Sequence, residues 1–291
     1  MIQQAGTRRI ETLAAADRPT ATSTTDCNGL GAETIEQYAG DPNFVTALAR
    51  GIAVLLALSD KRRHMTIAQV AHRTGISRAS VRRSLHTLST LGFAASDEAR
   101  RFHLRPRVLS FSHAYLSSSP LSTAAQPILD RLGDALRVAC SLATLDGDEV
   151  VFLARSTSSR IMSPALNVGR RQPAYCSSTG HLMLAHMPPR DLDAYLARTR
   201  FVPLTEYTIT SAAKLKAALA FAREMDYAYC AQQTDDRLCS LAVPVRDTAG
   251  TCIAGINVIL QGRPVPRDEI AARFLEPLQM AADELGSLLL P

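Results

Sequence analysis

The chain has 291 residues, of which 46% are hydrophobic, and its formal net charge is +5 at pH 7. This length and apolar content predict two domains, each with a core of its own. No apolar run reaches the roughly 20 residues that a membrane-spanning helix needs, and residues 1–40 lack the apolar segment of a signal peptide. We therefore expect a cytoplasmic protein with no membrane partner.

Cysteine usage argues against a metal or redox role. There is no C-x-x-C pair and no Cys/His cluster at the spacing of zinc ligands. We predict free, mostly buried thiols, no metal and no cofactor. The cysteines are Cys27, Cys140, Cys176, Cys230, Cys239 and Cys252.

The positive charge is concentrated in one segment. Residues 41–106 hold eleven Lys and Arg against four Asp and Glu, whereas residues 107–291 hold eighteen of each kind. Clustered basic charge is what neutralising DNA phosphates requires. The sequence thus predicts a DNA-binding domain over 41–106 and a separate function for the longer, neutral remainder.

The beginning of the chain differs from both parts. Residues 1–40 are rich in Thr, Ala and Gly, lack sustained periodicity and hold three basic against five acidic residues. We predict a mostly disordered arm. Arg8 and Arg9 leave open a role as a minor-groove arm, although they lie far from the domain.

Residues 44–59 are predicted to form an amphipathic helix. The side chains expected to face inward are Val45, Leu48, Ile52, Leu55 and Leu56. A charged turn follows at 60–63, and its Arg62 and Arg63 are candidates for phosphate contacts.

Residues 66–93 read as two short helices joined by a tight turn. Thr66 and Gln69 match a T-x-x-Q capping box, which marks a helix start. Gly75 is placed to end that helix in the left-handed conformation, and Ser77 to cap the next one.

The second helix, about 78–89, has an apolar side and a basic side. Val81, Ser84, Leu85 and Leu88 fall on one side at 100° per residue, and small and basic residues fall on the other. Such a helix suits a DNA major groove, where arginine can bond a guanine or a phosphate. A solvated basic face is the alternative interpretation.

A wing and a linker are expected after this helix. Residues 92–95 and 101–104 predict two short strands whose connecting turn carries Arg100 and Arg101, unless the hairpin is merely solvated. Residues 107–116 predict a linker helix, with a break at 117–120 before a helix over 121–138. The side chains expected at the DNA are Arg62, Arg63, Thr66, Ser77, Arg78, Ala79, Ser80, Arg82, Arg83, His86, Arg100 and Arg101.

Residues 121–291 predict an α+β domain. Strands are expected at 140–145 and 149–154 around an Asp-Gly turn, and then at 161–168, 227–232, 240–246 and 252–260. Helices are expected at 178–185, 189–197, 212–225 and 267–289. Consecutive hairpins imply a largely antiparallel sheet covered by helices, a small-molecule-binding architecture of the GAF or PAS kind.

From about residue 44 to its end, the chain resembles the isocitrate-lyase-regulator (IclR) family of bacterial transcription regulators. The supporting stretches include FVTALARGIAVL, SRASVRRSLHTLSTLGF, RIMS, PAYCSSTG and SLAVPVRDTAG. The match is nearest to the branch governing aromatic-acid breakdown, the protocatechuate and 4-hydroxybenzoate regulators. The resemblance implies a winged helix-turn-helix, a GAF-like effector domain, and homodimers or homotetramers on palindromic operators of double-stranded DNA.

An effector pocket is expected at the start of the helix over 178–185. Ser177, Ser178 and Thr179 stand where a helix has unpaired N–H groups and the positive end of its dipole, so an effector carboxylate could bind there. Helix capping by one of the serines is the alternative. The resemblance implies further walls at Ile161, Met162, Pro164, Tyr175, Cys230, Ser240 and Asn257.

Departures from the branch pattern border this pocket. Gln172 stands where the branch has leucine, and Gln233 and Cys239 lie in a stretch that is usually acidic and then G-L-R-S. Asn257 interrupts an apolar strand, and its buried amide could bond either an effector or a neighbouring loop.

We expect a ligand-responsive DNA-binding regulator, sensing a small carboxylic acid such as protocatechuate or 4-hydroxybenzoate. One alternative is a regulator whose second domain assembles oligomers and senses a non-aromatic compound or nothing. An enzyme, with Cys176 as nucleophile and His181 as base, is disfavoured because the chain lacks the usual catalytic motifs.

Overall fold

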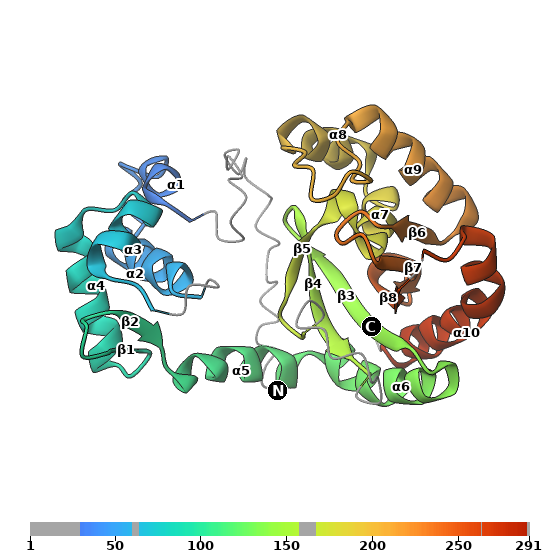
Figure 1. Cartoon of the computed structure of the whole chain (residues 1–291), viewed down its shortest axis with the longest axis horizontal. Helices are drawn as coiled ribbons and strands as arrows, with labels where there is room; N and C mark the ends of the chain where they lie inside the picture. Colours follow the sequence, from blue (N-terminus) through green and yellow to red (C-terminus); the bar gives the residue numbers. More distant parts are fainter. Residues whose placement is uncertain (1–29, 60–63, 157–166, 263, 290–291) are drawn as a thin grey trace, which may run out of the picture.

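The computed structural model describes residues 30–59, 64–156, 167–262 and 264–289. Figure 1 shows a helical N-terminal part and an α/β C-terminal part, joined by helix α5. No helix in these ranges is long and apolar enough to cross a membrane.

The N-terminal part is a winged helix-turn-helix. Its elements are α1 (Ala32–Glu36), α2 (Thr46–Ala57), α3 (Ile67–Thr74), α4 (Arg78–Thr90), β1 (Ala94–Ser96) and β2 (Phe102–Leu104). Strands β1 and β2 are antiparallel, and Met65 pairs with Phe102 beside them. The helices enclose one core that includes Val54, Val70, Val81 and Leu85.

The predicted capping holds in the structure. The Thr66 hydroxyl accepts from Gln69 N at 3.3 Å, and Gln69 Oε1 accepts from Thr66 N at 2.8 Å. Gly75 ends α3 with a φ of 70°, and the Ser77 hydroxyl accepts from Ser80 N at the start of α4. These local signals set where α3 ends and where α4 begins.

The predicted disordered arm over 1–40 is wrong for its last eleven residues. Helix α1 forms there, and Ile35 is buried in the same core as α2, α3 and α4. Leu30 and Ala32 pack against this core as well, so their apolar surface is better buried than left in water. Residues 1–29 lie outside the described ranges.

The predicted inward face of α2 is also wrong in part. Val45, Leu48 and Ile52 are 61%, 62% and 43% exposed, while Leu55 and Leu56 are half-buried. The buried side is made of Ala49, Ala53, Val54 and Ala57. Small side chains allow α2 to pack closely on α3 and α4, which leaves the larger apolar residues at the surface.

The linker region begins with a single 3-10 turn (Pro106–Val108), followed by α5 (Leu109–Ser118) and α6 (Pro120–Leu136). The Ser119 hydroxyl accepts from Ser122 N and caps α6. The predicted break between the two helices, at 117–120, is therefore shorter in the structure and lies at Ser119 and Pro120. These residues separate the linker helix α5 from α6, which packs on the C-terminal sheet.

The C-terminal part is built on a six-stranded antiparallel sheet in the order β5-β4-β3-β8-β7-β6. The strands are β3 (Ala139–Asp146), β4 (Glu149–Arg155), β5 (Arg171–Pro173), β6 (Ala228–Ala231), β7 (Leu238–Arg246) and β8 (Cys252–Gln261). The strand expected over 161–168 does not reach Val168, which lies in a turn, and residues 157–166 lie outside the described ranges.

Helices cover both faces of this sheet (Figure 1). Helices α6 and α10 (Arg267–Leu288) pack on one face, where Leu142, Leu241, Val243 and Ile256 form the main core. The other face is covered by α7 (Ser178–Ala185), with α9 (Ala212–Met225) behind it and α8 (Pro189–Arg198) beyond. Successive residues of a strand point to opposite faces of the sheet, so every second residue faces α7. The residues on that face include polar side chains as well as apolar ones.

Candidate functional site

The exposed side of α4 carries the predicted DNA-contacting residues. Arg78, Ala79, Arg82, Arg83 and His86 are all exposed, whereas Val81 and Leu85 on the opposite side are fully buried. Within the described residues, none of the three arginines forms an ion pair. Their guanidinium groups are therefore available for phosphates or guanine edges.

Three predicted DNA-contacting residues have structural roles as well. The Thr66 and Ser77 hydroxyls cap α3 and α4, and the Ser80 hydroxyl accepts from that of Ser77 at 3.1 Å. The capping bonds alone explain why hydroxyl side chains occur at these three positions, whether or not DNA is bound. Contact with a phosphate would be an additional role for them.

The turn between β1 and β2 presents two arginines. Arg100 is exposed and has a φ of 56°, and Arg101 Nε donates to Asp97 Oδ2 at 2.9 Å. Asp97 also accepts from Arg101 N, and this bond is the main reason that its pKa is lowered. Arg100 is thus the freer of the two cations; Arg62 and Arg63 lie outside the described residues.

A pocket opens between the face of the sheet that α7 covers and the start of α7. It encloses about 30 Å³, room for water-sized contents and far below the roughly 300 Å³ of a typical ligand pocket. None of the lining residues within the described ranges is charged. The lining consists of Val150, Phe152, Gln172, Cys176, Ser177, Ser178, Thr179, Cys230, Gln233, Thr234, Leu238, Ser240, Asn257 and Ile259.

Most of the effector-binding residues predicted within the described ranges line this pocket. These are Ser177, Ser178, Thr179, Cys230, Ser240 and Asn257. The predicted Ile161, Met162 and Pro164 lie outside the described residues. Sequence reasoning placed Gln172 and Gln233 beside the pocket without making them walls, and it missed Phe152 and Thr234, whose patterns are ordinary for a strand and a loop.

Three buried oxygen atoms in the pocket lack hydrogen-bond partners among the described residues. They are Ser178 Oγ, Thr179 Oγ1 and Asn257 Oδ1, in side chains that are at most 3% exposed. Ser177 differs, because its hydroxyl caps α7 by accepting from Gly180 N at 3.1 Å. Buried polar atoms are nearly always paired, so these three point to a bound polar group.

The start of α7 is held tightly against its surroundings. A Cβ added to Gly180 would lie 2.1 Å from Ala174 O, and one added to Gly255 of β8 would lie 3.0 Å from Thr179 Cγ2. Backbone therefore approaches backbone on one side of the helix, and the sheet supports it on the other. The N–H groups of Ser178 and Thr179 lie in the first turn, where no intrahelical carbonyl can accept from them.

Tyr175, another predicted wall, is not among the described residues that line the pocket. Its hydroxyl donates to Val202 O at 2.9 Å and accepts from Val202 N at 3.1 Å, and its ring packs edge-on against Phe201. Tyr175 lies in the single turn of 3-10 helix at Ala174–Cys176 and belongs to the core that α8 and α9 share.

His181, the base of the disfavoured enzyme alternative, makes its polar contacts within the described residues with groups other than Cys176. His181 Nε2 lies 2.7 Å from Tyr175 O, and its Nδ1 lies 3.4 Å from Cys230 Sγ. If Nε2–H donates to the carbonyl, Nδ1 accepts from the Cys230 thiol. Burial lowers the pKa of His181 to about 4 and raises that of Cys176 to about 12. Both groups are therefore held neutral, the opposite of an activated thiolate.

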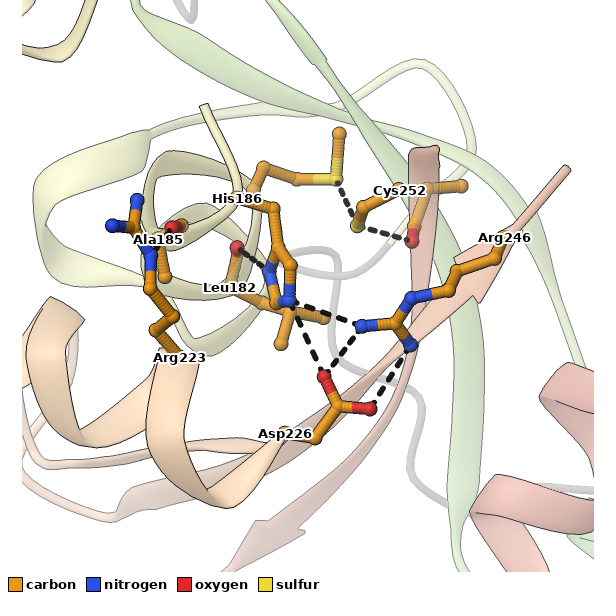
Figure 2. Close-up of polar contacts among 9 residues, drawn as sticks. Leu182, Ala185, His186, Arg223, Asp226, Arg246 and Cys252 are labelled. Carbon is orange, nitrogen blue, oxygen red and sulfur yellow. Dashed lines mark hydrogen bonds and ion pairs between the residues drawn. The ribbon is translucent and has the colours of Figure 1, made fainter. Parts of the chain in front are cut away.

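The other end of α7 is tied to α9 and β7 (Figure 2). His186 Nδ1 lies 2.9 Å from Leu182 O, and its Nε2 lies 3.1 Å from Arg246 Nη2 and 3.3 Å from Asp226 Oδ1. Arg246 binds both carboxylate oxygens of Asp226, and Arg223 Nε donates to Ala185 O. Helix α7 is thus fixed at its far end while its start faces the pocket.

Comparison with known proteins places both parts of the chain in one family. Residues 47–98 match the IclR helix-turn-helix domain, and residues 113–287 match the family described as bacterial transcriptional regulator IclR C-terminal. The chain is 44% identical over 255 residues to the Pca regulon regulatory protein of Pseudomonas putida, and the match covers 87% of each protein.

Solved structures agree with this assignment. An IclR family transcriptional regulator from Brucella abortus matches with a TM-score of 0.74 at 25% identity, covering 88% of this chain and 96% of that one. A double mutant of the PobR inducer-binding domain from Acinetobacter, in complex with 3-hydroxybenzoic acid, matches with a TM-score of 0.55 at 28% identity. That match covers 58% of this chain and 98% of the other.

Proposed function

We infer the function from one premise: this chain belongs to the IclR family of bacterial transcriptional regulators. Its relatives there regulate transcription, and they include the Pca regulon protein and PobR. We propose that it is a ligand-responsive regulator of aromatic-acid catabolism genes. Its second domain would bind a small aromatic carboxylic acid such as protocatechuate or 4-hydroxybenzoate.

The observation that carries the acid-binding proposal is the cluster of unpartnered oxygens at the start of α7. A carboxylate placed there would accept from the Ser178 and Thr179 hydroxyls and from N–H groups of the first turn. The described lining residues include no cation, so among them the helix dipole and these donors would stabilise the charge. Phe152, Leu238 and Ile259 would supply apolar contact for a ring, and side chains of the wall must move to admit one.

DNA binding is proposed for α4, the wing and residues 60–63. The exposed arginines of α4 would enter the major groove, and Arg100 would meet the backbone beside it. The helix α1 supports a DNA-binding domain that begins by residue 30 rather than 41. A linker over 107–120 and an effector-binding domain over 121–291 complete the proposed organisation.

Pairing into dimers is proposed because one winged helix contacts little DNA. The exposed apolar residues Val45, Leu48 and Ile52 on α2, with Leu109 and Phe111 on α5, would lie at the contact between two copies. Two-fold pairing matches a palindromic operator, and effector domains could join dimers into tetramers. Sedimentation equilibrium should detect a dimer or tetramer at micromolar concentration, and a monomer there would contradict the proposal.

A connected set of contacts could link the pocket to the DNA-binding domain. Val150 and Phe152 line the pocket from β4, and the last carbonyl of that strand, Arg155 O, accepts from Gln126 Nε2 at 2.9 Å. Gln126 belongs to α6, which follows the linker helix α5 after the break at Ser119. An effector would change DNA binding only if its affinity differs between two conformations of this linker.

Ligand-dependent stability tests the effector proposal. The full-length protein should be melted with protocatechuate, 4-hydroxybenzoate, β-ketoadipate, pyruvate and glyoxylate. At 100 times its dissociation constant, an effector should stabilise by about 2.7 kcal/mol and raise Tm by several degrees. A shift with an aromatic acid is expected. A flat response to all aromatic acids would favour the alternative, a domain that senses something else or only assembles oligomers.

A further inference from the structure

One wall of the pocket at the start of α7 is the side chain of Gln233, in the loop between β6 and β7. Gln233 and Thr234 of this loop line the pocket, and Gln233 is 9% exposed. The amide Nε2 of Gln233 donates to Sγ of Cys230, another lining residue, at 3.6 Å. Its Oε1 accepts from Ile209 N at 3.3 Å. The amide thus joins β6 to the segment that precedes α9.

The backbone of this loop is held more firmly than the Gln233 side chain. The Thr205 hydroxyl donates to Gln232 O at 2.5 Å, and the Thr208 hydroxyl donates to Gln233 O at 2.7 Å. The Thr208 hydroxyl also accepts from Leu204 N and Thr205 N, at 3.0 and 2.9 Å. The amide bonds of Gln233 are weaker, because one is long for an N–H···O bond and the other has sulfur as its acceptor. The side chain can therefore rotate while the loop stays in place.

Most other walls among the described residues lack this freedom. The first turn of α7 is fixed by the close backbone approach at Gly180, and the Ser177 hydroxyl is used in capping. Phe152 and Ile259 pack together in a buried apolar cluster on the sheet. Gln172, on the edge strand β5, is the other glutamine of the lining. Gln233 is distinguished by an amide that reaches a second residue of the lining and a neighbouring loop at once.

We propose that Gln233 is a gate residue that limits the size of the effector. This inference rests on the proposed function, in which an acid binds between α7 and the sheet. A space of about 30 Å³ admits no aromatic ring until a wall moves, and the Gln233 side chain rotates outward by breaking its bonds to Cys230 and Ile209. A pocket that is open for only part of the time binds with an affinity reduced by that fraction. The gate therefore weakens the binding of every acid, and its bulk excludes the larger ones.

The test is calorimetric titration of the full-length protein with two single-ring acids, protocatechuate and 4-hydroxybenzoate, and with the two-ring acid 6-hydroxy-2-naphthoate. Wild-type protein should bind the better single-ring acid roughly tenfold or more tightly than the two-ring acid. Gln233→Ala removes the side chain beyond Cβ, so the single-ring acid should bind about three- to tenfold more tightly than it binds wild type. The preference over the two-ring acid should fall to about threefold or less, because the excluding bulk is gone.

The matched control is Gln172→Ala, which removes the other glutamine of the lining. This variant leaves the gate and its open fraction unchanged, so both the affinity for the single-ring acid and the preference should stay within about twofold of wild type. Gln233→Ser, which keeps a small polar group, repeats the test if the alanine variant fails to fold.

The outcomes separate the gate from the proposed function. If Gln233→Ala binds the single-ring acid no more tightly than wild type and keeps the preference, the gate is overturned, while acid binding stands. The same follows if Gln172→Ala gives the larger gain, or if wild type binds the two-ring acid as tightly as the single-ring acids. If folded wild type and Gln233→Ala bind none of the acids, the acid-binding function is overturned, and the gate with it.

Discussion

Replacing Gly180 with alanine should destabilise the protein by about 2–4 kcal/mol and abolish effector binding. The new Cβ would lie 2.1 Å from Ala174 O and 2.5 Å from Ala174 Cα. Both are backbone atoms of the turn before α7, so no side-chain rotation relieves the clash. The first turn of α7 would have to move, and with it Ser178 and Thr179. Thermal unfolding and acid titration measure the two effects.

The matched control is Gly51→Ala in α2. A Cβ at Gly51 would meet nothing within 4 Å. Alanine favours a helix interior over glycine, so this change should be neutral or stabilise by up to about 1 kcal/mol. If Gly180→Ala melts like the wild type and binds acids normally, the close approach of α7 to Ala174 does not shape the pocket.

Replacing Arg83 with alanine should cost about 1–3 kcal/mol in discrimination between the operator and its single-base variants, or roughly 5- to 150-fold. Arg83 is exposed on the side of α4 opposite the buried Val81 and Leu85, and its guanidinium can bind a base edge in a bidentate manner. Fluorescence anisotropy with a duplex selected by the wild-type protein from random sequences provides the measurement.

The control for Arg83 is Arg100→Ala at the wing. Loss of a phosphate contact should weaken binding to all duplexes alike and reduce the slope of log affinity against log salt by about 1. The two variants should therefore differ in kind, one losing specificity and the other losing general affinity. Identical effects of both would show that α4 does not read bases in the groove.

Local signals made the helix-turn-helix predictable. Thr66, Gln69, Gly75 and Ser77 act within a few residues of their own positions, so the sequence alone places them. Which face of α2 is buried depends instead on how closely α3 and α4 pack against it, and this is a tertiary contact that the local sequence does not show. A hydrophobic pattern cannot tell a buried face of a helix from an exposed apolar face, and so Leu48 was assigned to the wrong surface.

The pocket was predictable only in part, for a related reason. Ser177, Ser178 and Thr179 follow one another at a helix start, where their chemistry is evident. Tyr175 contacts Phe201 and Val202, which follow it by 26 and 27 positions, and its own local sequence does not reveal these contacts. Gln233 and Ile209 are 24 positions apart, and only the tertiary fold brings the Gln233 amide to the Ile209 N–H group.

Operator binding by the full-length protein, with and without the acid that raises its Tm most, tests the central claim most directly. Anisotropy titrations should use the selected duplex and a scrambled duplex at the same salt concentration. The proposed function predicts that the acid changes operator affinity at least fivefold, in either direction, and leaves the affinity for scrambled DNA unchanged. An acid that clearly stabilises the protein yet leaves operator affinity unaltered would contradict a ligand-responsive regulator.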